Sequence, residues 1–339
     1  MKICSIKIAG WFRKEIMKKI CLIGCGNIGS RHLQSLVKLP FPIDIKIIEP
    51  FSESQELGKE RLSEIRYDKE LHNISWMKSI DELNDKPDLT IIATSAVGRV
   101  NLICKLLEMG HSRFLVEKVV CQSDNEYERL VKKFREFGAK GWVNTNRRYF
   151  ESYKKLKKIF SDSEIIHISV SSSNVSALAT SLIHYLDMFS FFTDDFNVNL
   201  NGDFLLNQLF PNKRGKDFVE FAGTVIGSIK NGSTFSMTSL PATKLPYVIN
   251  IIGKDKHIMI DETNERITNL LNPMDKEISF MYEHVSDLTN KITEDILSKD
   301  NCNLTTIQES QIHHKEIFRI FNQHIKKLTN VEHELCPIT

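Results

Sequence analysis

Short apolar runs alternate with longer stretches of helical periodicity across the first 144 residues. The runs are too short for buried helices, and the first leads directly into glycine, so they predict fully buried strands. The predicted strands cover residues 20–23, 43–49, 74–76, 89–94, 113–116 and 141–143. The predicted helices cover residues 28–39, 52–66, 97–109 and 124–137. Strands and helices that alternate at this spacing predict a parallel sheet with right-handed crossovers.

The pattern changes after residue 148, where runs with period-2 alternation become frequent. A helix over 150–160, a strand over 165–170 and a helix containing His184 come first. The predicted strands that follow cover residues 218–229, 232–238, 247–252 and 257–260, and a last helix covers 306–327. Asn231-Gly232 is a strong hairpin signal between the first two of these strands. The second half therefore predicts an open, largely antiparallel sheet with helices on one face.

A length of 339 residues suits two domains. We expect an α/β protein with an N-terminal extension over 1–16, a parallel-sheet domain over 17–144 and a second α/β domain over 145–339. The basic extension contains an apolar stretch that is too short and too interrupted for a signal peptide. The segment 17–19 resembles a natural start just before the first strand, so we expect the extension to be either a mis-assigned start or a short N-terminal arm.

Composition narrows the class of partner. The formal net charge is +2 and the basic residues are spread over predicted surface helices, so we expect no nucleic acid partner. No run of 18 apolar residues occurs, so no membrane span is expected. Seven scattered cysteines without a CxxC pair, and no HExxH or comparable spacing, favour free thiols in a reducing cytoplasm and no bound metal.

The segment 24–29 is a GxGxxG motif directly after a predicted strand and at the start of a helix. Gly24 permits the tight turn, Gly26 lets the backbone approach a pyrophosphate and Gly29 allows close packing of helix on strand. Asn27 and Ile28 complete the phosphate-binding turn at the helix N-terminus. The alternative is a glycine turn that binds no ligand.

Glu49 ends the next predicted strand, 20 residues after Gly29. A carboxylate there accepts hydrogen bonds from the ribose hydroxyls and repels a 2′-phosphate. Together with the glycine motif it predicts a Rossmann domain that binds NAD(H) in preference to NADP(H). The alternative is a strand-end acid with no ligand.

An ordered set of motifs resembles the glucose–fructose oxidoreductase/inositol dehydrogenase (Gfo/Idh/MocA) family over residues 18–327. The motifs are the segments 23–32, 87–95, 116–118, 143–148 and 184–187. In that family the first domain binds NAD(P), and the second contains an open antiparallel sheet through which many members form dimers or tetramers. Members oxidise or reduce a carbon of a sugar, polyol or nucleotide-linked sugar, and family tendency extends this to bacterial surface-glycan synthesis. The resemblance also assigns Thr94, Ser95 and Glu117 to the cofactor site.

Two positions depart from the family pattern. The family usually has proline after Glu-Lys, and here Val119 follows Lys118, which leaves the geometry of that loop open. The family often has aspartate four residues before the active-site histidine, and this chain has Thr180. A hydroxyl donates a hydrogen bond but supplies no charge, so any acid–base role of that position is weakened.

Hydride transfer at a carbinol carbon needs a group that takes or gives the hydroxyl proton. Lys118 follows a buried strand at the carboxyl edge of the predicted sheet, and burial would lower its pKa towards neutrality. The resemblance makes Lys118 and His184 the catalytic candidates, against the alternatives of a surface lysine and a structural histidine. The substrate candidates are Arg148, Asn174 and Asp187. Either Arg147 or Arg148 could face the cleft and bind a carboxylate or phosphate, with a salt bridge across the domain interface as an equal alternative. Asn174 and Lys244 are weaker candidates.

The leading hypothesis is an NAD(H)-dependent oxidoreductase acting on a sugar-like substrate, with a homodimer or homotetramer formed through the second sheet. A non-catalytic regulator that binds a dinucleotide is the second hypothesis, which Val119 and Thr180 keep open. The third is a reductase of C=N bonds, because a lysine and a histidine do not specify the acceptor.

Overall fold

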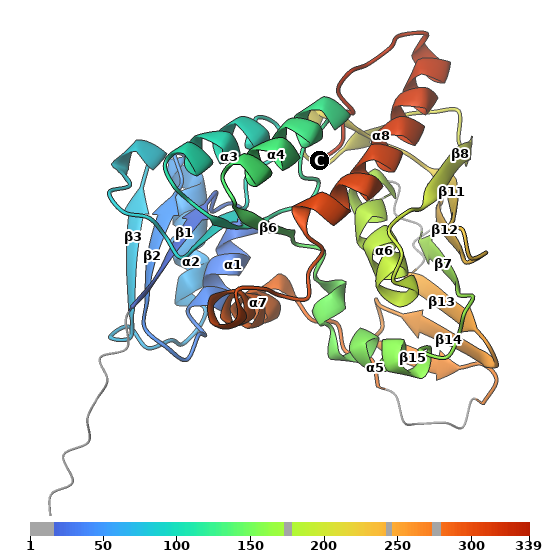
Figure 1. The fold of residues 1–339 in the computed structure, drawn as a ribbon, viewed down its shortest axis with the longest axis horizontal. Helices are drawn as coiled ribbons and strands as arrows, with labels where there is room; N and C mark the ends of the chain where they lie inside the picture. The colour runs from blue at the N-terminus through green and yellow to red at the C-terminus, as the bar shows by residue number, and fades with distance from the viewer. Residues whose placement is uncertain (1–16, 173–177, 242–245, 273–278) are drawn as a thin grey trace, which may run out of the picture.

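The computed structural model describes residues 17–172, 178–241, 246–272 and 279–339, which form two large sheets with their flanking helices (Figure 1). Two predicted substrate residues, Asn174 and Lys244, lie outside the described residues.

The first sheet contains six parallel strands in the order β3-β2-β1-β4-β5-β6. The strands are β1 (Lys18–Ile23), β2 (Ile43–Ile48), β3 (His72–Met77), β4 (Leu89–Ile92), β5 (Arg113–Val116) and β6 (Lys140–Val143). This is the strand order of the doubly wound dinucleotide-binding fold, in which ligands bind where the order reverses, beside β1 and β4. The predicted Rossmann domain is confirmed.

Two pairs of helices cover this sheet, with α1 packed on α2 and α3 packed on α4 (Figure 1). They are α1 (Gly29–Leu36), α2 (Ser52–Ser63), α3 (Arg99–Glu108) and α4 (Asp124–Glu136), with a 3-10 turn, η1 (Ile80–Glu82), before β4. The predicted helix over 97–109 begins later, at Arg99, because Gly98 adopts a φ of +69° outside the helical region.

The second sheet contains seven strands in the order β15-β14-β13-β7-β12-β11-β8, and only β7 and β12 pair in parallel. Its strands are β7 (His167–Ser172), β8 (Asn199–Leu205), β11 (Gly223–Ser228), β12 (Thr234–Ser239), β13 (Val248–Gly253), β14 (Lys256–Asp261) and β15 (Arg266–Asn269). The largely antiparallel sheet is confirmed. The single strand predicted over 218–229 is wrong, because the chain turns at Gly223, with a φ of +110°, and makes two strands. The first of these, β10 (Gly215–Glu220), pairs with β9 (Phe210–Asn212) in a separate hairpin.

One face of the second sheet packs against helices, and alternate residues of β12 are accordingly buried. The covering helices are α6 (Leu178–Thr193) and α8 (Ile307–Thr329) (Figure 1), and α5 (Glu151–Ile159) precedes β7 in the chain. The 3-10 turn η2 (Asn146–Tyr149) joins β6 to α5. Thr306 and Glu309 form a capping box that starts α8, which packs on both β6 and β8 and so joins the two domains.

Helix α7 (Val285–Lys299) returns from the second half of the chain to pack on α1 of the first domain (Figure 1). The Ser35 hydroxyl oxygen accepts from the Asn290 N–H at 2.9 Å, and Lys38 lies 2.8 Å from Asp287. The two domains are therefore not simply consecutive in the chain. None of the described helices has the length and apolarity needed to cross a bilayer.

Candidate active site

The glycine-rich turn between β1 and α1 contains two glycines that the fold needs and one that leaves space. Gly24 has a φ of +86°, which favours glycine. A Cβ on Gly29 would lie 1.9 Å from the Gly24 carbonyl oxygen, so helix and strand pack too closely for any side chain. A Cβ on Gly26 would meet only the Ser54 hydroxyl, at 3.9 Å. The free space at Gly26 fits a turn whose backbone a pyrophosphate approaches.

The start of α1 leaves backbone N–H groups available to an anion. Ile28 is the N-cap residue, and no side chain caps it. Asn27 is held by Arg61 of α2, whose guanidinium donates to the Asn27 backbone carbonyl at 2.6 Å and side-chain oxygen at 3.2 Å. Unsatisfied N–H groups and the positive end of the helix dipole suit this turn to phosphate.

Glu49 follows β2 and is buried against the glycine-rich turn. Its Oε2 accepts from the Cys25 N–H at 2.7 Å and its Oε1 from the Phe51 N–H at 3.0 Å. The carboxylate therefore ties the turn to the end of β2. Each carboxylate oxygen has a further lone pair, so this structural role is compatible with accepting ribose hydroxyls.

Thr94 and Ser95 follow β4 at the carboxyl edge of the sheet, but neither is among the residues that line the cleft between the domains. The Thr94 carbonyl accepts from Arg99, whose guanidinium also donates to the carbonyls of Glu117 and Val119. Arg99 is buried and fastens the loops after β4 and β5 to each other. No sequence pattern points to it, because an arginine in the first turn of a helix is usually a surface residue.

Glu117 follows β5 and lies in a buried network that joins four elements. Its Oε1 accepts from the Asn144 side-chain amide at 2.5 Å and lies 3.1 Å from His32 Nε2. His32 Nδ1 lies 2.8 Å from the hydroxyl oxygen of Thr289 in α7, and that hydroxyl donates to a backbone carbonyl. Burial opposes ionisation of Glu117, but the hydrogen bonds from His32 and Asn144 outweigh it and lower the pKa of the carboxyl. Glu117 is therefore a carboxylate held beside the glycine-rich helix.

Lys118 points across the cleft to the second domain, where its ammonium donates to the Thr180 carbonyl at 2.9 Å. Burial lowers the pKa of this amine to about 8, although the Glu117 charge acts in the opposite direction. The Lys118–Val119 peptide bond is cis, and Val119 is buried. An amine with a pKa near neutrality is suited to proton transfer.

His184, on α6, lines the same cleft. Burial, with smaller contributions from the charges of Lys118 and Arg147, lowers its pKa well below the usual value, so the imidazole is neutral. Its buried Nδ1 has no hydrogen-bond partner among the described residues. Buried polar atoms usually have a partner, so this nitrogen is a candidate for a hydrogen bond with a further group.

Thr180 lies one helical turn before His184, and a buried carboxylate from β10 reaches it. Glu220 accepts from the Thr180 hydroxyl and, at 2.9 Å, from the Ala179 N–H. Burial raises the pKa of Glu220, and the hydrogen bonds from α6 act against this rise. A carboxylate is therefore present beside Thr180, supplied from 40 residues further along the chain. Sequence reasoning missed Glu220, since nothing in the sequence links β10 to α6.

The two arginines after β6 have different surroundings. Arg147 lines the cleft, lies over the Tyr185 ring at 4.4 Å and is paired with Glu262 at 2.7 Å. Arg148 is buried and its Nε donates to Asp187 at 2.7 Å. Neither Arg148 nor Asp187 is among the residues that line the cleft, and the two side chains form an ion pair with each other.

The cleft has a volume of about 570 Å³ and receives residues from both domains. The first domain contributes Ile28, Glu117, Lys118 and Asn144, and the second contributes His184. An adjoining lobe of about 470 Å³ shares four residues with it and extends along the aromatic pair Tyr185 and Tyr247. The shared residues are Arg147, His184, Tyr282 and His284. Among the described residues, no group of three or more His, Cys, Asp and Glu is arranged to hold a metal ion.

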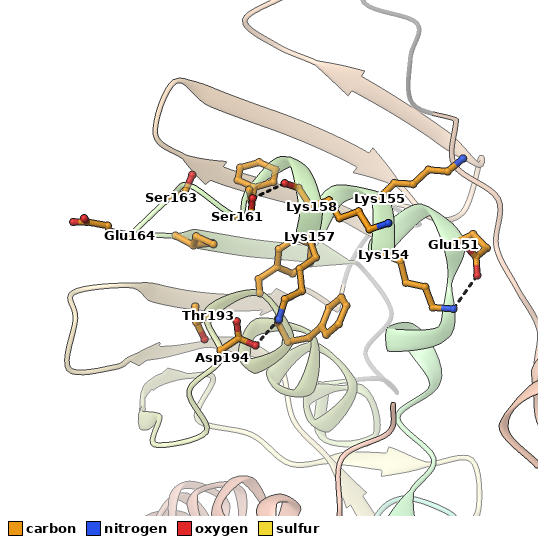
Figure 2. Close-up of a pocket in the computed structure, with 14 residues that line it drawn as sticks. Glu151, Lys154, Lys155, Lys157, Lys158, Ser161, Ser163, Glu164, Thr193 and Asp194 are labelled. Atoms are coloured by element: carbon orange, nitrogen blue, oxygen red, sulfur yellow. Dashed lines mark hydrogen bonds and ion pairs between the residues drawn. The ribbon is translucent and has the colours of Figure 1, made fainter. Parts of the chain in front are cut away.

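A larger depression of about 720 Å³ lies on the second domain beside α5 and the end of α6, and contains four lysines of α5 (Figure 2). Lys154 is paired with Glu151 at 2.8 Å, and Lys157 is paired with Asp194. No residue of the glycine-rich turn lines this depression, and neither does Lys118. The candidate chemistry is therefore concentrated in the cleft between the domains.

Similarity to solved structures extends over nearly the whole chain. An oxidoreductase from Agrobacterium radiobacter, in complex with NAD+, L-tartaric acid and magnesium, is 16% identical with a TM-score of 0.64, covering 89% of this chain and 94% of the other. The WlbA dehydrogenase from Bordetella pertussis, in complex with NADH and UDP-GlcNAcA, is 15% identical with a TM-score of 0.66, covering 90% and 96%. A putative myo-inositol dehydrogenase from Sinorhizobium meliloti is 15% identical with a TM-score of 0.62, covering 89% and 95%. These likenesses show that the fold is shared. No curated protein matches the chain.

The first domain is also matched by a protein-family model. The matched residues are 18–145, and the model describes an oxidoreductase family with an NAD-binding Rossmann fold. The match contains the glycine-rich turn, Glu49, Glu117 and Lys118. The first domain therefore matches the Gfo/Idh/MocA oxidoreductase family, which the motifs of the chain resemble.

Proposed function

We propose that the protein transfers a hydride between NAD(H) and a CH–OH carbon of a sugar, polyol or nucleotide-linked sugar. The observation that carries this proposal is that a proton-transfer amine, a neutral histidine and the start of the glycine-rich helix line one cleft. Lys118, His184 and Ile28 all line it. A dehydrogenase needs this combination, because the hydroxyl proton must move while the carbinol carbon is held against the nicotinamide.

The two groups have complementary roles in this proposal. NAD(H), when bound, supplies the hydride donor or acceptor. Lys118, with a pKa of about 8, takes the hydroxyl proton in the oxidation direction and returns it in the reduction direction. His184, neutral and with a free Nδ1, orients the reacting hydroxyl by a hydrogen bond. Closure of the cleft by both domains keeps water from the reacting carbon.

We propose a preference for NAD(H) over NADP(H) that depends on Glu49. Its carboxylate lies at the end of β2, where a 2′-phosphate would meet negative charge. Titration with NADH and with NADPH, followed by intrinsic fluorescence, tests this for wild type, Glu49→Gln and Glu49→Ala. Glu49→Gln keeps an oxygen for a backbone N–H and is expected to lose the discrimination between the cofactors, whereas Glu49→Ala also weakens NADH binding. Equal binding of both cofactors by wild type would contradict the preference.

Turnover is tested by absorbance at the nicotinamide band over a panel of sugars, polyols and nucleotide-linked sugars, with imine substrates as a further arm. We expect one sugar-type substrate to give cofactor turnover that depends on Lys118. Failure of the protein to bind either NADH or NADPH would contradict the oxidoreductase proposal. Turnover of an imine but of no sugar-type substrate would indicate a reductase of C=N bonds.

A non-catalytic dinucleotide-binding regulator is the second candidate, and the threonine at position 180 favours it. The Glu220 carboxylate beside Thr180 weighs against it, since the charge absent from position 180 is present next to it. Stoichiometric NADH binding with no turnover over the whole panel would support the regulator.

We also propose self-association through the open face of the second sheet. Phe204 and Ile226, on neighbouring strands, are exposed there. Exposed apolar side chains on paired strands suit an interface between identical chains. Light scattering of wild type and Ile226→Lys tests this, with loss of the oligomer expected in the variant.

A further inference from the structure

A hairpin outside both large sheets brings an arginine to the cleft. Arg214 lies in the turn between β9 and β10, and the Asn212 side-chain oxygen accepts from its backbone N–H at 2.8 Å. Its side chain lines the same cleft as Lys118 and His184. The base of the hairpin is anchored to the second domain, because Glu220 at the end of β10 accepts from the N–H groups of α6.

Residues 336–339 hold the hairpin from the other side. The Pro337 carbonyl accepts from the Val219 N–H of β10 at 2.8 Å. The Cys336 N–H donates to the Gln122 carbonyl at 2.7 Å, and the Gln122 side-chain amide donates to the Ile338 carbonyl at 3.1 Å. Gln122 is four residues after Lys118, so this segment fixes the hairpin beside the Lys118 loop. These contacts therefore fix the backbone of the hairpin beside the cleft, which the exposed Arg214 side chain lines.

Two of the cations that line the cleft, Lys118 and Arg214, form no ion pair among the described residues. Six lysine, arginine and glutamate side chains line it. Three form an ion pair among the described residues, namely Arg31 with Glu64, Arg147 with Glu262 and Glu283 with Lys291, and Glu117 is hydrogen-bonded to His32 and Asn144. The other two bind neutral oxygen atoms: Lys118 donates to the Thr180 carbonyl and Arg214 to the Thr339 hydroxyl at 3.1 Å.

Lys118 is the proton-transfer group of the proposed reaction, so Arg214 is the cation left for recognition. An arginine remains charged at any working pH and presents N–H groups in a fork that matches carboxylate and phosphate. Arg214 is exposed, so water can solvate its guanidinium beside a neutral sugar, whereas an oxyanion would form charge-assisted hydrogen bonds with it. The charge of Arg214 also adds to burial in lowering the pKa of Lys118, so an anion bound there would act on the reaction centre.

We infer that Arg214 is a specificity-determining residue that binds an oxyanion, a carboxylate or a phosphate, carried by the sugar-type substrate. The inference rests on the proposed function, because it places the substrate in the cleft with Lys118. It narrows the substrate class to acidic or phosphorylated sugars.

The test uses the full chain saturated with NADH and measures sugar binding by calorimetry. The probes are D-glucose, D-glucuronate and D-glucose 6-phosphate, with the corresponding galactose and mannose compounds. Wild type is compared with Arg214→Gln, and Lys216→Gln is the matched control, since Lys216 lies on β10 of the same hairpin but does not line the cleft. Melting temperatures establish that the variants are folded.

We expect at least one anionic sugar to bind wild type about tenfold or more tightly than its neutral counterpart. Arg214→Gln abolishes this advantage and leaves neutral sugars unaffected, and Lys216→Gln changes neither. The carboxylate and phosphate arms identify which oxyanion is recognised. The inference is overturned if no anionic sugar binds more tightly than its neutral counterpart, or if the advantage survives in Arg214→Gln. A protein that binds NADH and only neutral sugars would keep the proposed function and lose this inference.

Discussion

The two walls of the cleft are built differently. On the Rossmann wall the functional groups lie within short motifs, such as the glycine-rich turn and the Glu117-Lys118 pair directly after β5. On the opposite wall, His184 comes from α6 and Arg214 from a hairpin turn, and Glu220 of β10 is buried behind this wall, where it is hydrogen-bonded to α6. The positions of the groups on the first wall follow from backbone geometry that short sequence motifs specify. The positions of those on the second wall depend on contacts between residues distant in sequence. The comparison predicts that substitutions on the first wall abolish cofactor binding or proton transfer. Substitutions on the second wall should change substrate preference or the pH dependence of the reaction.

The largest effect is expected at Lys118, which extends from the first wall to the second. Lys118→Met removes the proton-transfer group but retains an unbranched chain of similar length, so kcat should fall by about 10²- to 10⁴-fold. NADH affinity should stay within a few-fold of wild type, because the glycine-rich turn and Glu49 are untouched. Steady-state kinetics with a fluorescence titration measure both. A kcat within tenfold of wild type would show that Lys118 does not transfer the proton.

The pH dependence of wild type follows from the pKa of about 8 for Lys118. Oxidation needs the neutral amine, so kcat/KM for oxidation should rise with pH and level off above about 8. Reduction needs the ammonium and should fall above the same pH. The pKa of His184 is lowered well below its usual value, so titration of His184 should not change kcat/KM near neutral pH. The limb near pH 8 should be absent from the residual activity of Lys118→Met.

The next largest effect is expected from substitutions in the glycine-rich turn. Gly26 and Gly29 lie in the same motif, so their valine variants form a matched pair. A Cβ at Gly26 meets only a hydroxyl at 3.9 Å, so Gly26→Val should fold with little change in melting temperature. Its side chain would occupy the space of the pyrophosphate and weaken NADH binding by about tenfold to a hundredfold, the loss of one charge-assisted hydrogen bond or more.

Gly29→Val is the contrasting variant. Its Cβ would lie 1.9 Å from the Gly24 carbonyl oxygen, so the melting temperature should fall sharply. If Gly26→Val binds NADH like wild type, the free space at Gly26 does not belong to the cofactor.

The same contrast explains what the sequence predicts well. The parallel sheet, the glycine-rich turn and the position of Lys118 after β5 follow from local patterns: buried apolar runs, turn glycines and the carboxyl edge of a strand. The extra strand break at Gly223 and the return of α7 to α1 depend on tertiary packing, which no local pattern records. The hairpin of β9 and β10 is likewise held by distant partners, Ala179 and Pro337.

Side chains near the motifs are harder to predict than the motifs themselves. Arg147 and Arg148 are adjacent in sequence, but η2 turns one towards the cleft and the other into the pair with Asp187. The charge pattern is the same for both, so only packing separates them. Arg99 is a further case, since its three carbonyl partners come from loops that the sheet alone brings together.

The smallest effect, and the sharpest test of the second wall, is expected at Glu220. Its negative charge acts on Lys118 to raise the pKa of the amine, opposite to the effect of burial and of Arg214. Glu220→Gln keeps an oxygen for the Ala179 N–H and removes the charge, so the pH limb of Lys118 should move to lower pH. Arg214→Gln should move the same limb to higher pH. We expect kcat at the optimum to change by less than about tenfold in Glu220→Gln, because the proton-transfer group remains.

A second substitution separates charge from packing at this position. Thr180→Asp in the Glu220→Gln background restores a carboxylate beside Lys118, from the residue whose carbonyl the ammonium already binds. The midpoint of the pH profile that reports Lys118 should then return towards its wild-type value. Thr180→Asn in the same background should leave this midpoint at the lower pH of Glu220→Gln. A limb that stays in place in Glu220→Gln would mean that Glu220 only caps α6. In that case the second wall would position Lys118 through its backbone contact alone, and the carboxylate of β10 would have no part in the proton transfer.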